Sequence, residues 1–196
     1  MALIATALAS AGLAQTEQLD VCRGKDKPTL DTRIGACTVI IQSGWGSAKE
    51  RAEIFHIRGT QYFYRADYDR AINDYNQAIK LDPGNSELFD NRCWTRATIN
   101  ELQGALADCK ESLRLRPNVA AALDTLGFVY LKLGQFDQAI ATYDAALKID
   151  PKSAYSLYGR GMAKLKIGDK TGGNADVAAA KAIKDVAAEM AGYGVK

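Results

Sequence analysis

The 196-residue sequence has little of what several classes of protein need. It contains one histidine, His56, and its net charge is only +2, from 25 Lys and Arg against 23 Asp and Glu. A single imidazole cannot build a multi-histidine metal site, and it leaves one such side chain for general-base chemistry. The small charge, without a long run of Lys or Arg, removes the bulk attraction on which nucleic-acid proteins depend. We therefore expect no nucleic-acid partner, no metal and no cofactor.

Long apolar runs are also absent. No segment approaches the ~20 apolar residues that a membrane-spanning helix needs. The uncharged stretch 1–14 is shorter, and it places Gly12 and Ala14 three residues and one residue before Gln15. These features are typical of a secretory signal peptide, although the usual basic residues at its start are missing. We expect export with no membrane span after processing; the alternative is an alanine-rich start on a cytoplasmic protein.

Cysteine is scarce, and its four positions are Cys22, Cys37, Cys93 and Cys109. They form no C-x-x-C motif, so the sequence suggests neither a zinc site nor a thioredoxin-like redox site. An even number permits complete pairing in an oxidising compartment, and local pairs, 22 with 37 and 93 with 109, are the simplest arrangement. The alternative for Cys93 and Cys109 is that both are reduced core residues, because free cysteine is often buried.

The few prolines reveal a repeat. Pro83, Pro117 and Pro151 are 34 residues apart, which divides the chain into units 52–85, 86–119, 120–153 and a degenerate 154–187. Small residues recur at the eighth position of the units, which holds Gly59, Cys93, Gly127 and Gly161. They recur at the twentieth position too, which holds Ala71, Ala105, Ala139 and Gly173. This pattern resembles the tetratricopeptide repeat.

The spacing within each unit predicts two helices. Apolar residues three, four and seven apart mark helix faces, and turn residues near 66, 100, 134 and 168 divide each unit. Small side chains let the paired helices approach closely. One hairpin cannot bury its apolar face, whereas three or more stacked hairpins share a core. We expect an all-α solenoid, and the resemblance implies that its hairpins form a right-handed superhelix.

Both ends of the array are expected to be capped. Residues 15–50 are predicted to form an amino-terminal cap with a helix over 30–42, after a segment, 20–29, too polar and irregular for a matching first helix. The repeat array is expected over 51–187. A C-terminal capping helix with an apolar stripe is predicted to close its other end, before a tail over 188–196; the stripe consists of Val177, Ala180, Ile183, Ala187 and Met190. Cys22 and Cys37-Thr38 also resemble the amino-terminal segment of exported tetratricopeptide proteins of Gram-negative bacteria, which implies a periplasmic location.

The resemblance further implies a concave groove lined by the first helix of each repeat. The candidate partner-binding residues at the groove positions are His56, Thr60, Phe63, Tyr64, Asp90, Asn91, Trp94, Asp124, Phe128, Tyr155 and Tyr158. Aromatic side chains dominate this set, and aromatics in a concavity commonly bind a peptide or helix. The alternative is that several of them are buried between neighbouring repeats.

Two other uses of the groove are not supported. Tetratricopeptide domains that grip a chaperone's terminal carboxylate use Lys, Arg and Asn side chains, and only Asn91 is retained at the matching positions, which hold His56, Thr60, Asn91, Ala121 and Thr125. A cysteine nucleophile with His56 as its base is disfavoured because Cys93 and Cys109 fall at core positions. We therefore expect a non-enzymatic scaffold that binds a protein or peptide segment. The alternatives are a cytosolic adaptor with reduced cysteines and an accessory subunit of an enzyme complex.

Overall fold

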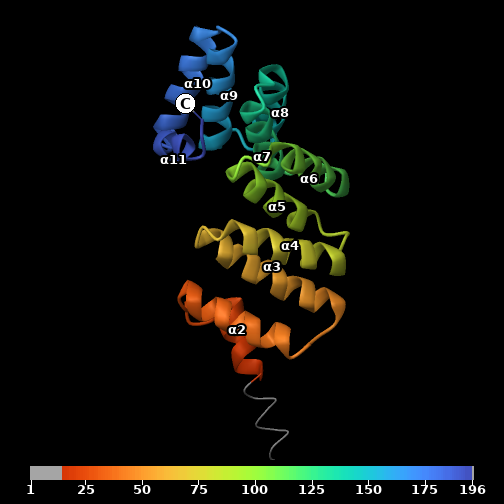
Figure 1. Ribbon diagram of the computed structural model, residues 1–196. Coiled ribbons are helices and arrows are strands. Elements are labelled where there is room, and N and C mark those ends of the chain that lie inside the picture. The colour runs from red at the N-terminus through yellow and green to blue at the C-terminus, as the bar shows by residue number, and fades with distance from the viewer. Residues whose placement is uncertain (1–14, 196) are drawn as a thin grey trace, which may run out of the picture. The chain divides into compact units, whose positions relative to one another are not determined.

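The repeat pattern folds into successive helices in the computed structural model, which describes residues 15–195 (Figure 1). The predicted signal peptide, 1–14, lies outside the described residues. The described chain is helical with no strand, and it divides into two compact units, one ending at Leu88 and one beginning at Phe89. In the first unit, residues 15–23 are helical and are followed by α2 (Leu30–Gln42), α3 (Ala48–Tyr64) and α4 (Tyr68–Leu81).

Helix α5 (Ser86–Thr98) begins in the first unit and continues into the second. The second unit then contains α6 (Leu102–Leu115), α7 (Ala120–Lys132), α8 (Phe136–Ile149), α9 (Ala154–Lys166), α10 (Lys170–Ile183) and α11 (Ala187–Gly192). The helices of each hairpin are joined by a tight turn with one left-handed residue, at Ala66, Asn100, Gly134 and Gly168. These are the turn positions expected from the 34-residue period.

The first hairpin, α3 with α4, begins earlier than the repeat register predicts. Ser47 caps α3, and its side chain and that of Glu50 form a reciprocal capping box, which satisfies two backbone N–H groups at the helix start. Helix α3 therefore starts at Ala48, four residues before the first repeat at Ala52. Ala71 and Ala78 of α4 are completely buried.

The amino-terminal cap contains more helix than expected. Residues 20–23 belong to the helix that covers 15–23, so the prediction of an irregular segment over 20–29 is wrong for its first part. Leu19 and Val21 of this helix pack against a cluster that includes Cys37, Ile40 and Ile54. The polar composition obscured the helix because burial of a few side chains, together with a covalent link to α2, compensates for weak intrinsic propensity.

Both local cysteine pairs are disulfides, Cys22 with Cys37 and Cys93 with Cys109. The second bridge lies at the eighth and twenty-fourth positions of its repeat. In the third repeat these positions hold Gly127 and Tyr143, which pack so closely that a Cβ atom on Gly127 would lie 2.8 Å from the tyrosine ring. In the second repeat the Cα atoms of Cys93 and Cys109 are 5.4 Å apart, so a covalent bond joins α5 to α6 where a ring fills the space in the third.

Buried ion pairs recur with the same period and were missed from the sequence. Arg58 pairs with Asp74, Arg92 with Asp108, and Arg160 with Asp176, each joining the first helix of a hairpin to the second. The Arg58 guanidinium donates two hydrogen bonds of 2.7 Å to the Asp74 carboxylate. The third repeat has Leu126 and Thr142 at these positions instead. A search for pairs of opposite charge at the seventh and twenty-third positions would have found the pattern.

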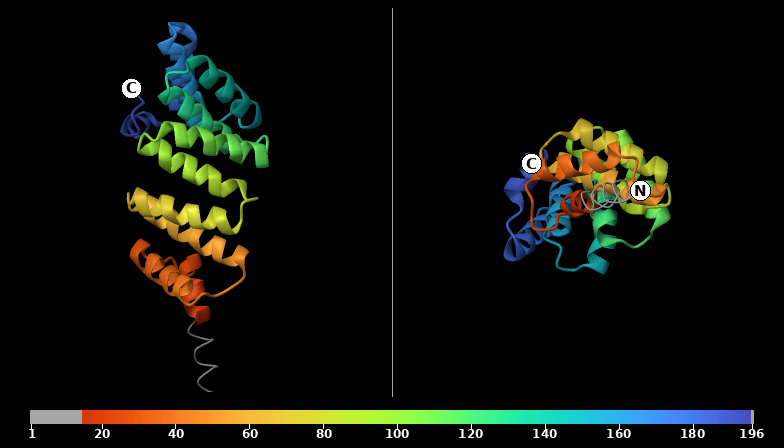
Figure 2. Two further views of the ribbon diagram at one scale, coloured as in Figure 1. Left: turned by 45° about the vertical axis from the view of Figure 1, so that its right-hand side comes forward. Right: turned by 90° about the horizontal axis from the view of Figure 1, so that it is seen from below.

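The carboxyl-terminal end of the described chain differs from the prediction. The expected stripe is interrupted because α10 ends at Ile183, whose side chain is 49% exposed. Ala180 and Met190 of the expected stripe are buried, and Val186 and Val195, which the stripe did not include, are buried as well. Residues 184–195, named here the C-terminal segment, therefore pack onto the second unit, and the prediction of a tail over 188–196 is wrong for 188–195. In Figures 1 and 2 this segment lies alongside the other helices of that unit.

We predict that Asp108→Asn lowers the free energy of unfolding by about 3 kcal/mol, because it leaves the largely buried Arg92 guanidinium without its counter-charge. Chemical denaturation measures the change. Glu111→Gln is the matched control, since it breaks an ion pair with Arg114 that lies at the surface of the same helix, and its effect should be small. Equal effects from the two substitutions would contradict a structural role for the buried pair.

Candidate functional site

The first helices of the second unit, α5, α7 and α9, bring several predicted groove residues together. The side of these helices that carries the predicted groove positions, named here the first-helix face, is defined by Trp94, Phe128 and Tyr155. The rings of Trp94 and Phe128 lie 4.9 Å apart between centroids. Phe128 is only 1% exposed, so it is not the open groove residue that the sequence suggested. The sequence-based alternative, burial, describes Phe128 correctly.

The C-terminal segment covers these rings. Tyr193 meets Trp94 edge-on at a centroid distance of 5.1 Å and Phe128 at 6.3 Å, with interplanar angles of 74° and 83°. Edge-to-face packing is a favoured geometry for aromatic side chains. The aromatic cluster therefore consists of two predicted residues and one, Tyr193, that the prediction assigned to a tail.

Tyr155 contacts the same segment through its hydroxyl group. Its Oη donates a hydrogen bond of 2.7 Å to Glu189 and accepts one of 2.6 Å from the Lys184 ammonium group. The same ammonium group lies 4.8 Å from the centre of the Tyr155 ring, a cation–π contact. Hydrogen bonding to Tyr155 raises the pKa of Lys184. Tyr158, one turn further along α9, packs against the buried core of the unit.

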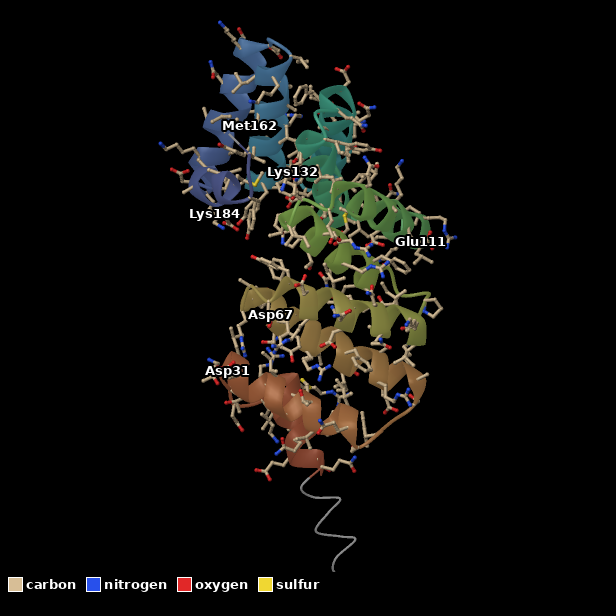
Figure 3. All side chains as sticks on the ribbon, viewed as in Figure 1. Asp31, Asp67, Glu111, Lys132, Met162 and Lys184 are labelled. Carbon is tan, nitrogen blue, oxygen red and sulfur yellow. A yellow bond between two sulfur atoms is a disulfide. The ribbon has the colours of Figure 1, made fainter. Side chains whose placement is uncertain are left out.

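A pocket adjoins the end of the C-terminal segment. It has a volume of about 260 Å³, and its lining includes Leu131, Met162, Gly194 and Val195. Lys132 also lines it, donates a hydrogen bond of 2.7 Å to the Ala97 carbonyl, and lies over the Phe128 ring. Figure 3 labels Lys132 and Met162 among the side chains of the second unit. Burial lowers the pKa of Lys132. The pocket thus combines apolar walls with two lysines, Lys132 and Lys166, of which Lys132 is partly desolvated.

Asp124 occupies a buried polar position between α7 and α9. Its carboxylate accepts a hydrogen bond of 2.5 Å from the Ser156 hydroxyl group. Burial raises the pKa of Asp124 to about 6, while the bond from Ser156 acts in the opposite direction. The completely buried Tyr143 lies close enough that the charge of Asp124 also raises the pKa of the Tyr143 hydroxyl, after burial itself. Asp124 is therefore a structural titratable group rather than an open groove residue. Asp90 and Asn91 are half-buried on α5.

The predicted groove residues of the first unit lie on α3 and form two separate groups. His56 lies 6.0 Å from Tyr75 between ring centroids, and Thr60 shares a hydrogen bond of 3.3 Å with the Tyr75 hydroxyl group. At the end of α3, Phe63 contacts Tyr64 and Tyr68, and Tyr64 is 68% exposed. Of the aromatic candidates on this helix, Tyr64 is the one open to solvent.

His56 also lines a pocket of about 410 Å³ within the first unit. Four acidic side chains and one lysine also line this pocket; they are Glu50, Glu53, Asp82, Glu87 and Lys49. Burial lowers the pKa of His56, and the charges of Glu87 and Glu53 act in the opposite direction. This pocket is thus polar and acidic, in contrast to the aromatic first-helix face of the second unit.

The side chains offer little for catalysis or metal binding. Within residues 15–195, no group of three or more His, Cys, Asp and Glu side chains is placed to hold a metal ion. All four cysteines are in disulfides, so none provides a thiol nucleophile for His56 to activate. The described helices also include none with the length and apolar character needed to cross a bilayer.

The sequence interpretation expected a capping helix at the C-terminal end of the array but placed its apolar register differently. Val186, Met190 and Tyr193 are four and three residues apart, which is itself a helical spacing. The prediction instead followed Ile183, Ala187 and Met190. An aromatic at the end of the stripe, Tyr193, was the signal that could have identified the correct register.

Comparison with known proteins identifies the repeats. The tetratricopeptide repeat family matches residues 52–85, and a second family described as TPR repeat matches 129–168. Stress-induced-phosphoprotein 1 of Caenorhabditis elegans is 41% identical over 49 residues, which is 25% of this chain and 15% of that protein. The chain spans between 9% and 15% of the length of the curated relatives that it matches.

Solved structures share the fold. MamA from Desulfovibrio magneticus RS-1, residues 41 to the end, superimposes with a TM-score of 0.76 at 16% identity, covering 88% of this chain and 96% of that one. The first TPR domain of Spaghetti (RPAP3), bound to the HSP90 peptide SRMEEVD, has a TM-score of 0.59 at 22% identity, covering 61% and 94%. At these identities the likeness shows an all-helical repeat fold and nothing further.

We predict that stability depends on pH through Asp124. Because its pKa is higher in the folded chain, about 6, than the ~4 of an unfolded aspartate, the folded state holds its proton more tightly. The contribution is most favourable below pH ~4, is lost as pH rises to ~6, and amounts to about 3 kcal/mol at most. Asp124→Asn should abolish this loss of stability with rising pH. Urea denaturation of both proteins at pH 4.5 and pH 7 measures the free energy of unfolding, and the same pH dependence in both proteins would refute the assignment of this effect to Asp124.

Proposed function

Because the chain is a tetratricopeptide-repeat protein, we propose that it is a non-enzymatic scaffold for protein–protein interaction, that it holds a segment of a partner on the first helices of its repeats, and that it works in the periplasm. The observation that carries the binding mode is the C-terminal segment itself. A stretch of polypeptide already rests on the first-helix face of the second unit, through an aromatic contact, a tyrosine–carboxylate hydrogen bond and buried apolar side chains.

The chemistry of this face favours an apolar and aromatic partner segment. Trp and Tyr contribute most where they fill a desolvated contact, and Trp94 and Tyr155 provide these side chains here. Salt should affect such binding weakly, because screening acts mainly on exposed charges. A partner held this way would present an amphipathic helix or short peptide.

The neighbour bound to an HSP90 peptide suggests a different ligand, and the side chains argue against it. Gripping a terminal carboxylate requires cations at defined positions of the first helices. In this chain the matching positions hold His56, Thr60, Asn91, Ala121 and Thr125, none of which is Lys or Arg. Burial also favours the neutral form of His56, since it lowers the pKa of that imidazole. We therefore propose that the partner is not of the carboxylate-terminated chaperone class.

The periplasmic part of the proposal is supported by the cysteines and by residues 1–14. Both disulfides are completely buried, and bridges of this kind form and persist in oxidising compartments. The alternative, a cytosolic adaptor, would contain thiols at all four positions. In that compartment Cys93 and Cys109 would pack as small apolar residues.

For the compartment we expect protein purified from its native cells to begin at or near Gln15 and to contain no free thiols when denatured without reductant. Intact-mass measurement after alkylation determines both properties in one experiment. The protein should be released with the periplasmic fraction. Four alkylated cysteines together with a retained Met1 would support the cytosolic alternative.

For the binding mode we predict that a photo-crosslinking amino acid captures a partner only from the first helices. It would replace Tyr64 on α3 or Tyr155 on α9, both aromatic positions, and the adducts would be identified by mass spectrometry after irradiation of living cells. Lys110 on α6 and Lys148 on α8 are the controls, because both are exposed on second helices. Adducts formed from these two positions and not from the tyrosines would place binding on the opposite side and refute the proposal.

A further inference from the structure

Resting on the proposed function, we infer what kind of segment the second unit recognises and how access to it is controlled. The first-helix face takes an acidic residue, an aromatic residue four positions later and an aliphatic residue two positions after that. In the C-terminal segment these are Glu189, Tyr193 and Val195. The segment is a built-in copy of the ligand, and an external segment of the same pattern must displace it.

The aromatic position is defined by two rings that pack against each other. Trp94 and Phe128 come from neighbouring hairpins, and Tyr193 contacts both of them edge-on. With Tyr193 in place, Phe128 is 1% exposed. Removal of Tyr193 would uncover an aromatic surface that water solvates poorly, so another aromatic side chain is the group best suited to fill it.

The acidic position is defined by Tyr155. Its hydroxyl group donates to the Glu189 carboxylate and accepts a hydrogen bond from Lys184, so the donor is aligned toward the acid. Lys184, which belongs to the segment itself, lies 3.6 Å from Glu189 and adds an ion pair within the segment. A basic or apolar residue at the Glu189 position would leave the Tyr155 donor without an acceptor.

The aliphatic position is that of Val195, beside the pocket that Lys132 lines. Val195 is 4% exposed, belongs to the same apolar cluster as Leu131 and Met162, and forms part of the wall of this pocket. The chain reaches it by reversing direction at Gly194, which has a left-handed φ of +90°. The Val195 N–H donates back to the Met190 carbonyl group at 3.0 Å and so closes the turn.

The segment is attached in a way that permits displacement. Lys184 has extended backbone angles, φ −157° and ψ 133°, and its N–H donates the last hydrogen bond of α10, to the Ala180 carbonyl group, so α10 is complete before the rest of the segment begins. Helix α11 has only six residues. Isolated helices of that length are unstable in water, so α11 is helical because it is docked. Undocking it would leave the hairpins of the unit intact.

Tethering gives the segment an advantage over a free peptide of the same sequence. An attached ligand acts at a high effective concentration, and an external peptide can bind only to the fraction of molecules in which the first-helix face is open. The C-terminal segment therefore sets a threshold of affinity that a true partner must exceed. Weakly apolar segments would be rejected.

The test uses the full chain and a fluorescein-labelled peptide with the sequence of residues 184–195. The opened variant is Tyr193→Ala with Val195→Ala, which weakens the internal ligand and leaves the face unaltered. We expect fluorescence anisotropy to show that the opened variant binds the peptide at least tenfold more tightly than the native chain. Adding Trp94→Ala to the opened variant should reverse the gain by tenfold or more.

Matched controls separate docking from general destabilisation. Ile183→Ala removes an apolar side chain that is 49% exposed just before the segment, and it should bind the peptide no better than the native chain. A control peptide with Glu189→Gln and Tyr193→Ser should bind the opened variant at least tenfold more weakly. Equal affinity of the native and opened proteins, or no binding to either, would overturn the inference.

A second measurement applies if the opened variant fails to fold. In the native chain, hydrogen exchange at the amides of 187–195 should accelerate when unlabelled peptide is added in excess, while α9 remains protected. Unchanged exchange with saturating peptide would overturn the inference. These measurements are independent of photo-crosslinking in cells: peptide exchange without cellular adducts would refute the scaffold function alone, and adducts without peptide exchange would refute the built-in ligand alone.

Discussion

The close contact between the two helices of each hairpin, at the eighth and twenty-fourth positions of the repeat, is the constraint on which the other features depend. Gly59 admits the ring of Tyr75 and Gly127 that of Tyr143, because any Cβ atom would meet the ring at 2.8–3.0 Å. In the second repeat a disulfide makes the connection instead. Each arrangement packs one side of the first helix closely against the second helix. The opposite side of the first helix is therefore left to bind other groups.

Buried Arg–Asp pairs fix the register of the two packed helices. A ring against a glycine tolerates some sliding, whereas a guanidinium and a carboxylate joined by two hydrogen bonds accept little change in register. The third hairpin lacks its own pair, and Arg160 of the fourth reaches Asp144 of the third instead, at 2.7 Å. Specific polar contacts thus link neighbouring hairpins of the second unit as well as the helices within them.

The two units use the resulting first-helix surfaces differently. In the first unit His56 lies in an acidic pocket, and Tyr64 is open to solvent. In the second unit the aromatic side chains are packed under Tyr193 of the same chain. One repeat pattern therefore supports a polar surface and an occupied aromatic one, because the groove positions differ independently between repeats while the positions at the helix contact accept only matched pairs of residues.

The sequence alone determined the period, the hairpins and their turns, since Gly, Ala and Pro at fixed positions reflect local sterics that act within one repeat. It also identified the aromatic residues of the first helices, such as Trp94 and Phe128. Only the tertiary structure decided which of them are covered, because covering depends on Tyr193, far along the chain. The helix over 15–23 was missed, and the extent of the C-terminal capping helix was misplaced, for the same reason: short segments with weak propensity become helical through the surfaces they pack against, and a linear pattern does not contain those surfaces.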